Sequence, residues 1–204
     1  MSTDSAFETS SKILNLIVVG YAIATIGFLA FLTINGMSGI SEVAPVVTAV
    51  LIAVGLLLPA SCMFLLRREI ANTQLQTRRS FSLQGIGLII LFSGVVLVAV
   101  SSSLSDYVVG GILLIASDAA ALTGVILLKK HVGIPILQKR KIDYLVLATV
   151  FLFSGVGLIV ISNIAFYYIL SQVENTVYAD VGATISACGC VLAAYSFLTS
   201  RSRN

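Results

Sequence analysis

The sequence predicts an all-α membrane protein, in which six transmembrane helices form three tandem helical hairpins with both termini in the cytoplasm. Three observations lead to this prediction: an apolar composition, six long apolar segments and an uneven distribution of basic residues. Of the 204 residues, 58% are hydrophobic and 10% are charged, whereas about 25% of residues are charged in an average soluble domain. We therefore expect residues 1–204 to form a single integral-membrane domain.

Six apolar segments are each long enough to cross a bilayer, for which about 20 helical residues are needed. Lipid offers the backbone no hydrogen-bond partner, so apolar segments of this length are expected to be helical. They occupy residues 13–34, 44–66, 85–104, 107–128, 144–170 and 179–199. Taken in pairs after a short polar segment, 1–12, they give hairpin repeats at residues 13–66, 85–128 and 144–199.

The basic residues alternate with the apolar segments and predict the orientation of the chain. All twelve Lys and Arg residues fall in four polar segments, at positions 12, 67–79, 129–141 and 201–203. The other three loops, near residues 35–43, 103–107 and 171–179, contain no Lys or Arg. Because cytoplasmic loops collect Lys and Arg, both termini are predicted to be cytoplasmic, together with the loops at residues 67–84 and 129–143.

The net charge of +3 is expected to anchor the chain near anionic lipid headgroups rather than to bind nucleic acid. The basic residues flank apolar segments and do not form one face. The N-terminal residues lack the basic and short apolar regions of a cleavable signal, so the first apolar segment is expected to stay. These features predict a multi-pass protein of a cell membrane, surrounded by lipid.

Small residues recur every seven positions within the apolar segments, in register with the basic residues that follow them. Counting back twelve positions from the first basic residue after each even-numbered segment gives Gly55, Ser117 and Gly189. The residues seven positions to either side of these are also small: Thr48, Cys62, Gly110, Gly124, Gly182 and Ser196. The odd-numbered segments carry Gly20, Gly27, Gly87, Gly94, Ser101, Gly155 and Ser162. We call all of these positions the small-residue stripe.

Seven residues are close to two helical turns, so each set lies along one side of its helix. Small residues allow two helix backbones to approach closely in lipid, and we expect the stripe to face neighbouring helices. The alternative is that glycine is simply frequent in membrane helices. The shared register across all six segments favours packing.

Parts of two apolar segments can also be aligned without a gap, LFSGVVLVAVS at 91–101 and LFSGVGLIVIS at 152–162, which are identical at seven of eleven positions. Together with the small-residue stripe and the basic residues that end each hairpin, this layout resembles the HdeD-like acid-resistance membrane proteins. That family is built from short tandem two-helix repeats with periodic glycines. The resemblance covers nearly the whole chain and implies a role in envelope or acid stress, with no catalytic residues to carry over.

Asp118 lies near the middle of the fourth apolar segment, where an acidic residue costs about 2.5–3.5 kcal/mol on insertion scales. Intramembrane carboxylates commonly mark proton or cation paths, but none of the six segments contains Lys, Arg or His. Three states stay open: a protonated carboxyl hydrogen-bonded to Ser or Thr, an ionised one with a cation or water, and one paired with another subunit. The candidate partners at similar depth are Ser93, Ser154 and Ser186.

The sequence contains no catalytic constellation, and we expect no enzyme activity, no cofactor and no metal site. Cys188 and Cys190 are two positions apart, so on a helix they point about 200° apart and do not bridge. We expect a structural or accessory component, or an envelope-stress component, that acts through helix packing and partners. It would work as a homo-oligomer or within a larger membrane complex. The alternative is a small proton- or cation-linked transporter or channel that uses Asp118.

Overall fold

The computed structural model describes residues 3–35, 43–70, 74–100, 104–130, 139–166, 168–169 and 171–198. The regular structure in these ranges consists of six α-helices: α1 (Thr3–Asn35), α2 (Val43–Glu69), α3 (Leu75–Val100), α4 (Leu104–Lys130), α5 (Lys139–Phe166) and α6 (Gln172–Leu198). Each helix contains a stretch that is long and apolar enough to cross a membrane. The prediction of an all-α chain with six spans is therefore confirmed.

The helices are longer than the apolar segments, most clearly at three N-terminal ends. Helix α1 begins at Thr3, inside the segment expected as a polar extension, and α3 begins at Leu75 rather than at residue 85. No Gly or Pro interrupts residues 75–84, so the polar residues there continue the helix. Apolarity marks the part of a helix that lipid can cover, and it does not mark where the helix ends.

Helix α6 also begins early, at Gln172 rather than at residue 179, and a capping box explains why. The backbone N–H and the hydroxyl of Ser171 donate to Glu174 Oε2 at 2.9 and 2.8 Å, and the Glu174 N–H donates to Ser171 Oγ at 3.3 Å. This reciprocal pair satisfies backbone donors that the first helical turn leaves free. A segment expected as an outer loop is therefore the first two turns of α6.

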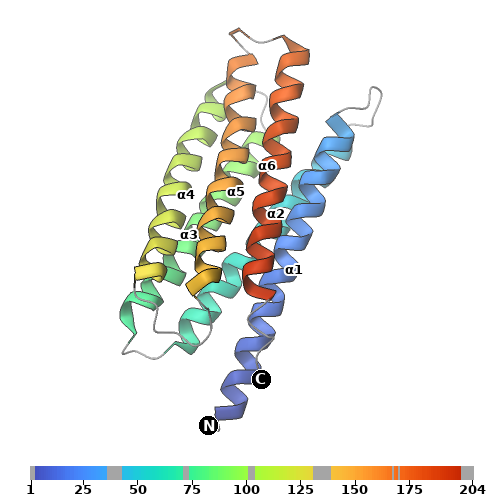
Figure 1. Ribbon diagram of the computed structural model, residues 1–204. Coiled ribbons are helices and arrows are strands. Elements are labelled where there is room, and N and C mark those ends of the chain that lie inside the picture. The colour runs from blue at the N-terminus through green and yellow to red at the C-terminus, as the bar shows by residue number, and fades with distance from the viewer. Residues whose placement is uncertain are drawn as a thin grey trace.

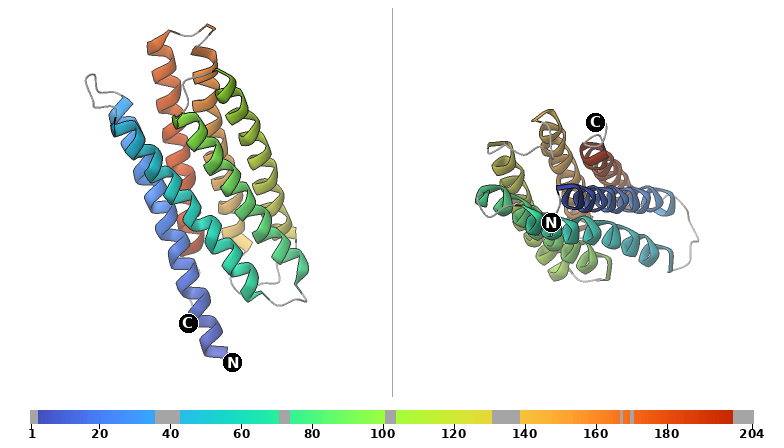
Figure 2. Two further views of the ribbon diagram at one scale, coloured as in Figure 1. Left: turned by 180° about the vertical axis from the view of Figure 1, so that it is seen from behind. Right: turned by 90° about the horizontal axis from the view of Figure 1, so that it is seen from below.

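Each helix packs against its neighbours in the chain, and α6 packs against α1. The bundle is therefore a closed ring of six helices (Figure 1, Figure 2). At the closing contact, the rings of Tyr21 and Phe197 stack with their centroids 6.4 Å apart. A ring of this kind gives the bundle an interior that all six helices line.

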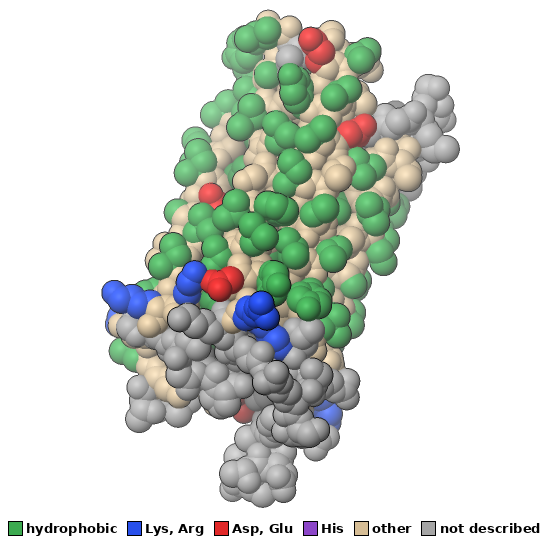
Figure 3. All heavy atoms as spheres, viewed as in Figure 1, with side chains coloured by type: hydrophobic (Ala, Val, Ile, Leu, Met, Phe, Trp, Pro, Cys, Tyr) green, Lys and Arg blue, Asp and Glu red, His purple; other side chains and the backbone are tan. Residues whose placement is uncertain are grey.

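The two ends of the bundle differ in charge. Helix α1 begins and α6 ends at the same end (Figure 1). On the face shown in Figure 3, the Lys and Arg side chains gather at this end. Lys129 and Lys130 lie there in the last turn of α4, and Lys129 Nζ lies 2.7 Å from Asp143 Oδ1 at the start of α5. We call this the basic end and the opposite one the distal end.

Large apolar side chains cover the outside of the ring (Figure 3). Ile115 is 73% exposed and Ile161 is 63% exposed, while Phe28, Leu56 and Phe81 are buried inside. A soluble monomer rarely exposes a continuous apolar surface of this extent. In a bilayer, lipid covers the same surface at no such cost.

Candidate functional site

Glycines of the small-residue stripe lie where α1 meets α2. A Cβ atom at Gly55 would overlap the backbone of Ala24, and one at Gly20 would overlap the ring of Pro59. A Cβ at Gly27 would lie 2.7 Å from Ile52 Cγ1. The two backbones can approach this closely only because these side chains are absent.

The α3–α4 contact is built in the same way. A Cβ at Gly87 would lie 2.9 Å from the Ser117 carbonyl oxygen, and one at Gly124 would lie 2.8 Å from the Ser80 carbonyl oxygen. Gly94 is looser, because the nearest atom, the carbonyl oxygen of Gly110, would be 3.5 Å away.

Helices α5 and α6 are in close contact at Gly155, Gly182 and Gly189. A Cβ at Gly155 would overlap the hydroxyl of Ser186 and the carbonyl of Gly182. A Cβ at Gly189 would lie 2.5 Å from the backbone nitrogen of Leu152. The remaining described members of the stripe are buried as well: Thr48, Cys62, Gly110, Ser117, Ser162 and Ser196. Ser101 lies outside the described residues.

A buried polar contact also joins α3 to α4, near the basic end. Ser80 Oγ donates to the Gly124 carbonyl at 2.5 Å, and Gln84 Nε2 donates to Ser80 Oγ at 3.2 Å. Neither residue was predicted from the sequence to lie between helices. A signal was available, because Ser80 lies seven positions before Gly87 and so extends the stripe by one step.

Asp118 sits on the side of α4 and not on the axis of the ring. Its side chain is partly exposed, between the buried Ser117 and the exposed Ala119. Its Oδ1 atom is buried and has no hydrogen-bond partner. A buried oxygen without a hydrogen bond is unfavourable, and the rest of the carboxyl lies at the partly exposed surface of α4.

The three serines expected near Asp118 occupy different places. Ser93 is exposed, and its hydroxyl donates to the Ile89 carbonyl of its own helix at 3.0 Å. Ser186 is buried between α5 and α6, where its hydroxyl donates to the Gly182 carbonyl at 2.9 Å. Neither is bonded to Asp118 Oδ1.

Ser154 lies on the exposed side of α5, close to the level of Asp118. The register follows from two contacts across the α4–α5 pair. A Cβ at Gly157 would lie 3.3 Å from Leu114 Cδ2, and one at Gly111 would lie 3.7 Å from Val160 Cγ1. Because the two helices are antiparallel, one further turn along α4 brings Asp118 level with Ser154.

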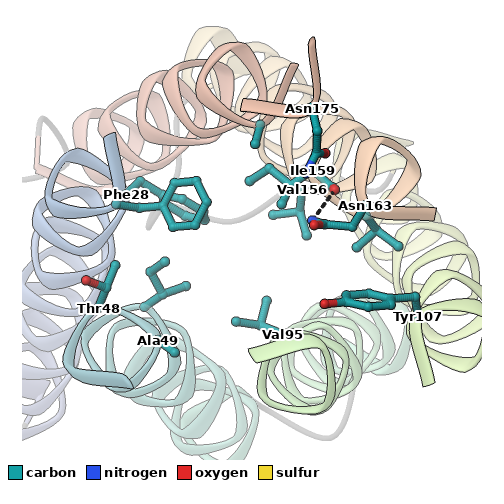
Figure 4. Close-up of a pocket in the computed structure, with 13 residues that line it drawn as sticks. Phe28, Thr48, Ala49, Val95, Tyr107, Val156, Ile159, Asn163 and Asn175 are labelled. Atoms are coloured by element: carbon teal, nitrogen blue, oxygen red, sulfur yellow. Dashed lines mark hydrogen bonds between the residues drawn. The ribbon is translucent and has the colours of Figure 1, made fainter. Parts of the chain in front are cut away.

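A cavity lies inside the ring at the distal end, and all six helices contribute to its wall (Figure 4). Its volume is about 250 Å³. Most of the wall is apolar, with Phe28 and Phe31 from α1 on one side. The polar members are Thr48, Tyr107, Asn163 and Asn175.

The polar groups of this distal cavity differ in how they are satisfied. Thr48 Oγ1 donates to the Ala44 carbonyl at 2.9 Å, and Asn163 Nδ2 donates to the Ile159 carbonyl at 2.8 Å. Asn175 Oδ1 is buried without a hydrogen-bond partner.

The sequence did not point to Asn175, because it lies in a segment expected as a loop. Asn163, a single amide within the apolar run ISNIAF, was a detectable signal.

A second, smaller void of about 20 Å³ lies deeper in the ring, between residues that include Tyr21, Gln84 and Leu88. It has room for about one water molecule. Leu88 lines this smaller void, and Val95 lines the distal cavity. Leu91 lies between them on α3, about one turn from each, and is 1% exposed. Asp118 lines neither void.

The fold and the surface define a class, a polytopic membrane protein with six spanning helices. No known family, curated protein or solved structure matches the chain, so the likeness to HdeD-like proteins stays a prediction. Among the described residues, no three His, Cys, Asp or Glu side chains are grouped as a metal site. The candidate functional groups are Asp118 and the polar residues of the distal cavity.

Proposed function

We propose that this protein is a non-catalytic membrane component whose role is to associate with another membrane protein through the outer side of α4 and α5. In this proposal the chain forms three tandem hairpins, and the basic end faces the cytoplasm, as the distribution of Lys and Arg favours. The observation that carries the proposal is Asp118, a partly exposed carboxyl at the middle of a spanning helix, in a chain whose apolar segments contain no basic residue.

The surrounding surface suits a second helix. Helix α4 has the smallest buried share of the six spans. Ile115 and Leu122 lie one turn before and after Asp118, on the same side of α4; Ile115 is exposed and Leu122 is half-buried. Ser154 and Ile161 continue this surface on α5, where both are exposed. We call these five residues the α4–α5 lateral surface. Its small member, Ser154, permits close approach of another backbone.

Charge complementarity supports one kind of occupant. Ionisable groups inside a bilayer generally pair with one another, and Asp118 has no basic residue in any apolar segment of its own chain. A second copy would bring another carboxyl and no counter-charge. The partner that fits is a spanning helix of a different protein, with a Lys or Arg at mid-membrane depth.

A photo-crosslinking residue placed at Ile115, which is 73% exposed, tests this proposal in cells. The proposal predicts an adduct with a second protein, and the crosslinked peptide should carry a Lys or Arg within its own apolar span. The yield should fall by about tenfold or more in Asp118→Asn, since one partner of a buried charge pair is lost. It should persist in Asp118→Glu.

The matched control places the same crosslinker at Val191, which is exposed on α6, and should give no such adduct. An adduct only between two copies, an adduct that Asp118→Asn leaves unchanged, or no adduct at all would each refute the proposal.

The carrier alternative draws less support from the site, because Asp118 lines neither internal void. It predicts that the purified chain dissipates a proton or cation gradient in proteoliposomes and that Asp118→Asn stops this flux. An accessory role predicts no flux in either form, so the two functions separate in one assay.

A further inference from the structure

We infer that the distal cavity binds a small neutral aromatic molecule, which apolar contacts hold inside the ring. The volume of the cavity and the side chains of its wall both lead to this class of ligand. The site is separate from the α4–α5 lateral surface, because Asp118 does not line the cavity. The ligand and the partner helix can therefore be tested independently.

The size of the cavity sets the size of the ligand. An apolar cavity of roughly 150 Å³ holds a benzene molecule, and drug-sized ligands occupy roughly 300 Å³ or more. At about 250 Å³, the distal cavity matches one aromatic ring with a short side chain. All six helices contribute to its wall, and each helix packs against its neighbours. This enclosure favours a free small molecule over the acyl chain of a lipid that stays in the bilayer.

The apolar part of the wall suits an aromatic guest. Phe28 from α1 and Tyr107 from α4 lie on opposite sides of the cavity (Figure 4). Phe31 also lines it, together with the aliphatic side chains of Ile52 and Val95. Aromatic rings in offset or edge-to-face contact gain more than the burial of their area alone. An aromatic ligand should therefore bind more tightly than an aliphatic one of equal size.

The polar side chains of the wall favour a neutral ligand over a charged one. Thr48 Oγ1 and Asn163 Nδ2 each donate to a carbonyl of their own helix. Asn175 Oδ1 is itself buried, so a ligand in the cavity does not reach it. The described residues that line the cavity include no Asp, Glu, Lys, Arg or His. An ionised ligand would lose its hydration there without meeting a counter-charge, which is unfavourable.

Photolabelling with a neutral aromatic probe, trifluoromethylphenyldiazirine, tests this inference on the full chain in phosphatidylcholine nanodiscs. Mass spectrometry locates the labelled residues. Labelling at Phe28, Val95 and Val156, which line the cavity, should saturate as the probe concentration rises. Ile126 and Val191 are exposed on the outside of the ring, and their labelling should rise without saturation because the probe also dissolves in lipid.

Competitors of matched shape identify the class of ligand. Excess propylbenzene should suppress labelling inside the cavity and leave labelling of Ile126 and Val191 unchanged. Two charged analogues of similar size, phenethylammonium and phenylacetate, should each need about tenfold higher concentrations or more, because burying a charge without a partner is costly.

A pair of substitutions on α2 separates the cavity from the outer surface. Ala49→Phe fills the cavity, since Ala49 lines it, and should abolish the saturable labelling. Val50→Phe alters the next residue, which is 52% exposed, and should be labelled as the parent is. Unchanged labelling of Ile126 and Val191 shows that each variant keeps its fold.

The competition in the parent chain decides the matter even if Ala49→Phe does not fold. The inference is wrong if labelling inside the cavity is absent, or if it rises without saturation as it does on the lipid-facing side. It is equally wrong if either charged analogue competes as well as propylbenzene, or if a folded Ala49→Phe is labelled like the parent.

Discussion

At the residue scale, the glycines of this chain fall into two groups that differ in what they contact. Gly155 faces the backbone of α6, with no room for a further atom, whereas Gly111 has 3.7 Å to the nearest side-chain atom. Backbone cannot move aside as a flexible side chain can. The first group therefore sets the distance between helices, and the second does not.

Gly155→Ala is predicted to destabilise the bundle by about 1–3 kcal/mol, the usual cost of overpacking a well-packed contact. Gly111→Ala should be neutral or slightly stabilising, because alanine is the better helix former. The free energy of unfolding, measured by titration with sodium dodecyl sulfate in mixed micelles, compares the two variants. Equal effects of the two substitutions would show that Gly155 does not govern the α5–α6 distance.

The sequence could predict positions along each helix better than contacts between helices. The seven-residue period located the small-residue stripe, and the structure places its described members at contacts between helices or in the interior. The partners proposed for Asp118 needed the rotation and register of several helices at once. Ser186 shows the difficulty, since it lies at a suitable depth but is enclosed between α5 and α6.

At the scale of the helices, local chemistry decides where α6 begins. The capping box of Ser171 and Glu174 extends α6 beyond its apolar part, and hydropathy alone could not reveal this. The number of spans, in contrast, follows from composition and length, and it was predicted correctly.

The contact between α3 and α4 combines a glycine with an interhelical hydrogen bond. Ser80→Ala removes the donor to the Gly124 carbonyl and is predicted to cost about 0.6 kcal/mol, up to about 1.7 kcal/mol, as such bonds do in membrane proteins. The measurement is again the free energy of unfolding in mixed micelles.

Ser82→Ala is the matched control, because the Ser82 hydroxyl donates only within its own helix, to the Arg78 carbonyl at 2.8 Å. Its effect should be close to zero. A loss in Ser82→Ala as large as that in Ser80→Ala would argue against a special role for the bond between helices.

At the scale of the whole molecule, closing the ring creates properties that no single helix carries. The distal cavity takes residues from all six helices, and its lining residues are far apart in the sequence. No periodicity within one segment could have assembled Phe28, Tyr107 and Asn175 at one site. The orientation of the helices across the membrane, unlike the cavity, is predicted from the sequence alone by the alternation of basic segments.

The central claim is this orientation across the membrane, with the basic end in the cytoplasm. Labelling of single cysteines tests it directly. Cys62, Cys188 and Cys190 are free and are replaced by alanine. One cysteine is then introduced either at Gln74, exposed at the basic end, or at Gln172, exposed at the distal end. With a membrane-impermeant maleimide, the account predicts labelling at position 172 in intact cells and at position 74 only after permeabilisation. Labelling of position 74 from outside intact cells would contradict it.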